Sequence, residues 1–411
     1  MSDDEPTERV QVLVIGAGPV GMSAALALRA RGLPATILEA DPEDRDRSGS
    51  RAIYVHGATL RTLEHNHPGL GKQLAEAGLV WPTRRTLFRG EEVFSRTYPD
   101  EGGSEGLPHF TSLPQVRTEE FMLEACREAD VDIHWDSPVE TVESSAEGVR
   151  VVTEDGEVWE AEYVVGADGA RGPTREQIGS EFEGDRSENS YIIADVEALP
   201  DDPREVARVF HYEHPALDGR NVLVVPFQGG WRLDIQCRVS DDPEAMSQDD
   251  VVADMVAAVM GEEYADRVTW VSTYQFLQVI ADSFVDEHRR VLLAGEAAHL
   301  FAPFGARGMN SGVADADAAA SAIKVAVGAE ESAVARDEIE KFAAERETAA
   351  EWNRDAAGAA LRHLRGDGIV VNAKKRLAAE ASEWWEPAGE WLDEAPYGPS
   401  GGPPIPTGTK Y

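Results

Sequence analysis

Three glycines near the N-terminus, Gly16, Gly18 and Gly21, follow an apolar run that reads as a buried strand. Gly16 would permit a sharp turn, Gly18 would let the backbone approach a pyrophosphate, and Gly21 would let the next helix pack closely on the strand. The N-terminus of that helix offers free N–H groups and a positive dipole end to phosphates. Glu39 ends a second apolar run, 23 positions after Gly16, near the offset of an acid that holds a ribose diol. The stretch therefore predicts a dinucleotide-binding site.

Two later segments repeat the pattern of a strand end, a glycine and an acid. In the first segment Asp168 follows a buried strand, and in the second Gly295 and Glu296 do. A second glycine-rich turn then leads into a helix expected to begin near Ser311, and this turn contains Pro303, Gly308, Met309 and Asn310. A nicotinamide dehydrogenase needs only the first glycine motif, whereas a cofactor held along its whole length needs all three segments. The set favours a tightly bound FAD over a diffusible NAD.

The order of the expected strands and helices around these residues predicts an α/β protein. We expect a Rossmann-like nucleotide-binding domain, built on the GxGxxG strand–helix–strand unit, interleaved with an antiparallel β-sheet substrate domain and followed by C-terminal helices. The expected nucleotide-binding segments are 10–80, 110–180 and 285–330, and the expected substrate-domain segments are 81–109 and 181–284. The remaining expectations are a disordered lead-in at 1–9, helices over 331–390 and an irregular tail over 391–411.

Local patterns add three helix predictions. One helix is expected from Gly57 to about Leu79, and a second from Thr118 to Ala129 with Thr118 as its N-cap. A third is expected from about Asn372 to Trp385.

The overall charge is strongly acidic. Lys and Arg number 38 against 76 Asp and Glu, which gives a net charge of −38. Such a field repels nucleic acid and anionic membranes, so neither is an expected partner. Acid-rich, lysine-poor composition is typical of proteins from salt-loaded cytoplasm, and we expect a halophilic protein. No run of 18 apolar residues and no signal-peptide pattern is found, so a cytoplasmic protein without an integral membrane segment is expected.

The glycine and acid motifs resemble those of the class A, single-component flavoprotein aromatic hydroxylases with the para-hydroxybenzoate hydroxylase fold. That family carries GxGxxG, then a DG motif at a strand end, then a GD motif, and the resemblance spans roughly residues 10 to 350. Its strongest part is GEAAHLFAPFGARGMNSG. The resemblance implies FAD as the cofactor and NAD(P)H as a transient co-substrate, since only one GxGxxG is present.

The resemblance also assigns roles to residues. It implies that Glu39 binds the adenosine ribose and that Arg51 and Gln115 contact the pyrophosphate and ribityl region of FAD. Asp168 would belong to the DG motif, which contributes to FAD binding and is implicated in the use of NAD(P)H. Gly295 and Glu296 would match the GD motif, whose acid binds the ribityl chain.

The flavin ring would lie by the last turn. Pro303 would flank its edge, and Met309 and Asn310 would begin the helix whose amides face the flavin N1–O2 locus. The family has Asp where this chain has Glu296, and the extra methylene moves the carboxylate by about 1.5 Å. We therefore expect FAD to bind in a slightly altered position or less tightly.

The implied reaction is hydroxylation of an aromatic, phenolic or related small molecule. By the resemblance, NAD(P)H would reduce the flavin, O₂ would form a C4a-hydroperoxide, and its distal oxygen would attack the substrate. No base for the phenol is assigned: the polar residues of the expected substrate sheet are interpreted as structural, and so is His299. The polar residues of that sheet considered for this role are Tyr191, His211, Tyr212, Gln236 and Tyr274.

Two alternatives stay open at this point. One is an FAD-dependent reductase of isoprenoid double bonds, and the other is a non-catalytic flavin-binding protein. Neither NADH nor NADPH is favoured, and both a monomer and a homodimer fit the sequence. The pair His65 and His67 lies beside a proline in an expected loop, so we predict no metal site.

Overall fold

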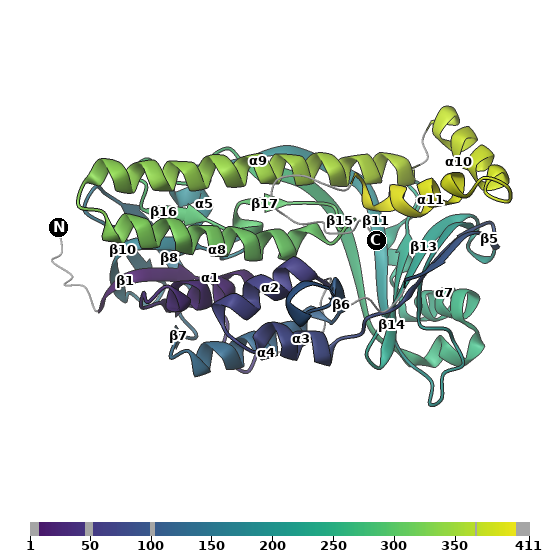
Figure 1. The fold of residues 1–411 in the computed structure, drawn as a ribbon, viewed down its shortest axis with the longest axis horizontal. Helices are drawn as coiled ribbons and strands as arrows, with labels where there is room; N and C mark the ends of the chain where they lie inside the picture. The colour runs from purple at the N-terminus through teal and green to yellow at the C-terminus, as the bar shows by residue number, and fades with distance from the viewer. Residues whose placement is uncertain (1–7, 46–51, 99–102, 366–367, 400–411) are drawn as a thin grey trace.

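The computed structural model describes residues 8–45, 52–98, 103–365 and 368–399, and its two large sheets are joined by long helices (Figure 1). The first sheet contains β1 (Glu8–Ile15), β2 (Thr36–Leu38), β7 (Asp132–His134), β8 (Val139–Ser144), β9 (Val149–Thr153), β10 (Val158–Gly166) and β16 (Val291–Leu293). Its order is β7-β2-β1-β10-β9-β8, with β16 also paired to β10. Strands β7, β2, β1, β10 and β16 are parallel, and β9 and β8 are antiparallel.

The second sheet has eight strands in the described part of the chain. They are β4 (Thr83–Phe88), β5 (Glu91–Thr97), β11 (Phe182–Glu197), β12 (Ala207–His214), β13 (Arg220–Phe227), β14 (Gly230–Gln236), β15 (Val268–Ala281) and β17 (His299–Leu300). Their order is β17-β15-β11-β14-β13-β12-β4-β5, antiparallel except for β12 and β4. A small sheet pairs β3 (Tyr54–His56) with β6 (Phe110–Ser112).

Helices cover both sheets. They are α1 (Pro19–Ala30), α2 (Gly57–Asn66), α3 (Leu70–Ala77), α4 (Gln115–Glu128), α5 (Thr174–Gln177), α6 (Pro243–Met246), α7 (Asp249–Met260), α8 (Arg307–Gly328), α9 (Ser332–Arg365), α10 (Ile369–Ala381) and α11 (Glu386–Glu394). Short 3₁₀ turns include η1 (Ser104–Gly106), η2 (Pro215–Leu217), η3 (Glu262–Arg267), η4 (Gly295–Ala297) and η5 (Ala395–Tyr397). None of the helices described is both long and apolar enough to cross a membrane.

The long helix α9 packs together with the helices that cover the sheet of mainly parallel strands. Helices α1 and α8 share the largest buried apolar cluster, to which α9 also contributes. Figure 1 shows α9 running beside α8 and reaching the eight-stranded sheet, where α10 and α11 lie. On that sheet, the apolar side chains of one face pack with α7. The α/β class, with a Rossmann-like unit, an antiparallel sheet and C-terminal helices, is confirmed.

Two helix predictions near the N-terminus were wrong in their bounds. The helix expected over 57–79 is interrupted after α2, where Pro68 cannot donate a backbone hydrogen bond and Gly69 takes a φ of +101°. Helix α4 begins at Gln115 with Pro114 as its N-cap, so Thr118 lies inside the first turn and is not the cap. Proline fits a helix start because its missing N–H would be unpaired there.

Three later bounds also differ. Helix α8 begins at Arg307, before the expected Ser311, because the left-handed turn already ends at Ala306. Helix α10 ends at Ala381, and a separate helix α11 continues to Glu394. The start of the expected irregular tail is therefore helical, while 1–7 and 400–411 lie outside the described residues.

Candidate active site

The first glycine turn is tightly enclosed on one side and open on the other. Gly16 has a φ of +103°, and a Cβ there would lie 2.5 Å from the carbonyl oxygen of Ala167. A Cβ on Gly21 would lie 1.8 Å from the carbonyl oxygen of Gly16. A Cβ on Gly18 would meet no atom within 4 Å. The fold itself therefore requires Gly16 and Gly21, whereas Gly18 leaves space beside the N-terminus of α1.

That space belongs to a cavity of about 1630 Å³. The cavity exceeds the ~300–1,000 Å³ of an ordinary small-ligand pocket, so it has room for an extended cofactor and a second molecule. It brings together residues of all three motif segments: Gly16, Gly18, Glu39, Gln115, Asp168, Glu296, Pro303, Gly308, Met309 and Asn310. Gly21 and Gly295 do not line it, and Arg51 lies outside the described residues.

Glu39 connects the end of β2 to the glycine turn. One carboxylate oxygen accepts a hydrogen bond from the backbone N–H of Ala17. The other accepts from the N–H of Asp41 at 3.0 Å and from Arg45 at 3.1 Å. The carboxylate is buried and lies against the cavity, so it is fixed at the edge where β2 ends. Arg45, which the sequence reasoning missed, joins the same edge.

Asp168 follows the end of β10. Its Oδ2 accepts a hydrogen bond from the N–H of Thr174 at 2.9 Å, while its buried Oδ1 has no partner among the described residues. A Cβ on Gly172 would come within 2.0 Å of its Cγ, so glycine is needed for the carboxylate to lie there. Burial raises the pKa of Asp168. An unpaired buried acceptor at the cavity wall suits a ligand hydroxyl or amide.

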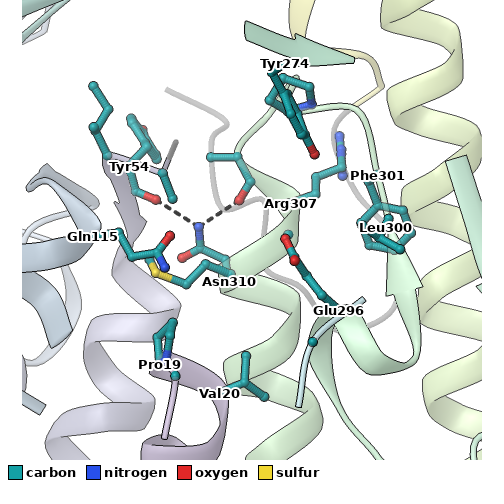
Figure 2. Close-up of a pocket in the computed structure, with 18 of the residues that line it drawn as sticks. Pro19, Val20, Tyr54, Gln115, Tyr274, Glu296, Leu300, Phe301, Arg307 and Asn310 are labelled. Atoms are coloured by element: carbon teal, nitrogen blue, oxygen red, sulfur yellow. Dashed lines mark hydrogen bonds between the residues drawn. The ribbon is translucent and has the colours of Figure 1, made fainter. Parts of the chain in front are cut away.

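Glu296 lies in η4, directly after β16, and Figure 2 shows its carboxylate directed into the cavity opposite Gln115. Gly295 beneath it has a φ of +63°, and a Cβ there would lie 2.7 Å from the Val20 side chain of α1. The close contact sets the position of η4 against α1. The Gln115 amide donates to Glu119 at 2.8 Å.

The start of α8 is fixed by Asn310. Its Nδ2 donates to the carbonyl oxygens of Tyr54 at 2.9 Å and Ala306 at 2.7 Å (Figure 2). Its Oδ1 accepts from the N–H of His56 at 2.9 Å and from the hydroxyl of Thr59 at 2.7 Å. The side chain thus joins α8 to β3 and α2, and its amide has no free group for a ligand. Any contact of this residue with a flavin would have to come from its backbone.

A buried ionic cluster supports the η4 turn. The Asp315 carboxylate contacts His299 at 2.7 Å and Arg346 at 2.6 Å, and it accepts from the N–H of Gly295 at 3.1 Å. Although burial opposes it, Arg346 and His299 lower the pKa of Asp315 to about 2. His299 also stacks on Phe301 at a centroid distance of 4.5 Å. These contacts agree with the structural interpretation of His299.

One face of the eight-stranded sheet forms the other wall of the cavity. Most of the residues on this face were not predicted from the sequence as part of a site. They occupy alternate positions on neighbouring strands: Arg84, Tyr191, Ile193, Arg208, Phe210, Leu223, Val225, Arg232, Asp234, Tyr274 and Phe276. The alternation in β14 carried the available signal, since Trp231, Leu233 and Ile235 pack with α7 while Arg232 and Asp234 face the cavity. The other sheet residues named from the sequence have different places: Tyr212 bonds to Leu392 and His363, and His211 and Gln236 do not line the cavity.

The arginines of this wall pair with carboxylates. Arg84 and Arg208, opposite one another on β4 and β12, both contact Asp393 of α11, Arg208 at 2.7 Å. Arg232 makes two bonds of 2.7 Å to Asp195. The wall therefore combines buried ion pairs with aromatic side chains.

No group of three or more His, Cys, Asp or Glu side chains in the described ranges could hold a metal ion. His65 contacts Glu105 at 3.2 Å and His67 contacts Glu128 at 2.9 Å.

The site fits FAD on three observations: the open side of Gly18, the unpaired Oδ1 of Asp168, and the starts of α1 and α8 at one cavity. Residues 9–356 match the FAD binding domain family, and the chain belongs to this family. FAD is accordingly its cofactor.

Two relatives that the chain resembles carry monooxygenase names. The chain is 32% identical over 323 residues to a 6-methylpretetramide 4-monooxygenase of Streptomyces rimosus, covering 74% of this chain and 54% of the relative. It is 27% identical over 325 residues to a rifampicin monooxygenase of Streptomyces venezuelae, covering 74% of this chain and 62% of the relative. The chain thus spans between half and two thirds of the length of these two relatives.

The fold is similar to that of p-nitrophenol 4-monooxygenase from Pseudomonas putida. The TM-score is 0.76 at 22% identity, covering 95% of this chain and 99% of that structure. At this identity the similarity establishes the fold.

Proposed function

We propose that this chain is an FAD-dependent monooxygenase that hydroxylates a phenolic or related aromatic small molecule, with NAD(P)H and O₂ as co-substrates. The observation that carries the proposal is the single cavity shared by the dinucleotide motifs and by an aromatic sheet face. Monooxygenase names among the relatives support the reaction class.

In this proposal one part of the cavity binds FAD and the other binds the aromatic substrate. Gly16, Gly18 and Glu39 would hold the adenosine-pyrophosphate end of FAD, and Asp168 and Glu296 would hold its middle. Bound FAD would supply electron transfer from NAD(P)H and activation of O₂. The N-terminus of α8 would place positive backbone dipoles beside the flavin ring. The sheet face would exclude water and orient the aromatic ring.

By the resemblance, Glu296 stands where the family carries Asp, and its carboxylate still reaches the cavity. The departure therefore leaves an acid available to the ribityl chain. We propose weaker or slightly shifted FAD binding as its effect, and replacing Glu296 with Asp should then tighten FAD retention.

The experiment follows oxidation of NADH and of NADPH in air by the FAD-loaded protein, with and without each member of a phenol panel. Faster oxidation with a phenol, together with a hydroxylated product, supports the proposal. Oxidation that yields only hydrogen peroxide with every phenol contradicts it. Saturation of a prenyl chain without O₂ would instead identify a reductase.

A further inference from the structure

One carboxylate on the aromatic wall has no structural task. Asp234 lies on β14 between Ile193 of β11 and Leu223 of β13, and all three line the cavity. Among the sheet residues described as lining the cavity, it is the only carboxylate. Its Oδ1 is buried and has no hydrogen-bond partner there.

The neighbouring arginine does not neutralise this carboxylate by contact. Arg232 is two residues away on the same face, but its Nε and Nη2 each bond to Asp195 at 2.7 Å. Burial raises the pKa of Asp234 to about 6, with Arg232 opposing the increase and Asp195 adding to it. An unpaired carboxylate in such surroundings costs free energy, which suggests a role with a ligand.

A phenol group stands on the same face beside it. Tyr191 is paired with Gln236, two residues along β14 from Asp234, and its buried hydroxyl has no partner among the described residues. Burial raises the pKa of Tyr191, and the charge of Asp234 adds to the increase. Tyr191 therefore stays protonated and can donate a hydrogen bond to a negatively charged oxygen.

We propose that Asp234 is the catalytic base that accepts the phenolic proton of the substrate, and that Tyr191 holds the oxygen left behind. The phenol O–H bond breaks, its proton passes to the Asp234 carboxylate, and the electron pair stays on the oxygen as phenolate. The aromatic ring becomes more electron-rich and more reactive toward an electrophilic oxygen. This inference rests on the proposed function.

The first test needs no turnover and uses 4-nitrophenol with the FAD-loaded protein at about pH 8, where Asp234 is ionised. The free probe is then largely phenolate, and two negative charges cannot share the site without a proton. Wild type should take up about one proton per bound probe, and Asp234→Asn about none. Calorimetry in buffers of different ionisation enthalpy measures the difference. Equal proton uptake by the two proteins would overturn the assignment.

The second test uses turnover. Hydroxylation by wild type should fall as the pH drops through about 6, because protonated Asp234 cannot accept a proton, and Asp234→Asn should lose this limb. At neutral pH the variant should be slower by ~10²–10⁴-fold with phenol and much less impaired with 4-nitrophenol, which ionises without help. An equal deficit with both phenols would overturn the assignment.

Two controls separate the possible failures. Asp234→Asn is isosteric and removes an unpaired buried charge, so its melting temperature at about pH 8 should equal or exceed that of wild type. Glu183→Gln removes an exposed carboxylate from β11 and should leave both readouts unchanged. Wild type that neither binds 4-nitrophenol nor hydroxylates any phenol would contradict the proposed function and the base with it. Wild type that does both, with Asp234→Asn behaving identically, would contradict the base alone.

Discussion

At the scale of single residues, the glycines of the first turn have separable roles. A Cβ at Gly16 or Gly21 collides with backbone atoms, whereas a Cβ at Gly18 points into open cavity. Mutations at neighbouring positions can therefore test separately whether a glycine is required for folding or for cofactor binding.

Replacing Gly18 with Val should leave the chain folded and make FAD binding at least about 100-fold weaker, because the side chain fills the space where the pyrophosphate approaches. The measurement is the flavin absorbance of the purified protein and FAD titration of the apoprotein. Gly328→Val is the matched control, since Gly328 also has no atom within 4 Å of its Cβ but lies outside the cavity. Yellow, FAD-saturated Gly18→Val protein would contradict the assignment.

At the scale of elements, the start of α8 depends on one amide. Asn310→Asp replaces two donated hydrogen bonds, to Tyr54 and Ala306, with contacts between a carboxylate and carbonyl oxygens. We expect unfolding free energy to fall by more than about 3 kcal/mol, as measured by urea denaturation. Gln73→Glu, the same change at an exposed helical position, should have little effect. Equal stabilities for the two variants would show that the amide does not fix α8.

The ion pairs of Asp315 should also stabilise the fold measurably. Asp315→Asn leaves Arg346 buried without its counterion, and we expect a loss of about 3–5 kcal/mol at neutral pH. Because the folded pKa of Asp315 is about 2, below its unfolded value, its contribution exists above about pH 4 and is lost as the pH falls toward 2. The stability difference between wild type and variant should therefore shrink on acidification, and a constant difference would contradict the ionic role.

For the whole molecule, the charge of −38 predicts a strong dependence on salt. Self-repulsion among carboxylates is screened as ionic strength rises, so the melting temperature should rise steeply between about 0.1 M and about 3 M KCl. Differential scanning calorimetry at fixed pH measures it. A melting temperature insensitive to KCl would refute the halophilic interpretation of the composition.

The meeting of the motif residues at one place could be predicted from the sequence because short motifs place glycines and acids at strand ends. Gly18, Asp168 and Glu296 are far apart in the chain, and the described structure brings them to one cavity. The sheet wall could not be predicted as a site, because only pairing between strands brings Asp234 and Arg208 to the cavity. Helix bounds failed where a turn conformation, at Gly69 and Ala306, outweighed helical periodicity.

We propose that one cavity holds FAD and an aromatic substrate together so that oxygen passes from O₂ to the ring. The most direct test of this proposal is mass spectrometry of the product formed from a stimulating phenol under ¹⁸O₂, with the FAD-loaded protein and NAD(P)H. We expect one ¹⁸O atom in each molecule of hydroxylated product. A product without the label, or NAD(P)H oxidation that never yields a hydroxylated ring, would contradict the proposal.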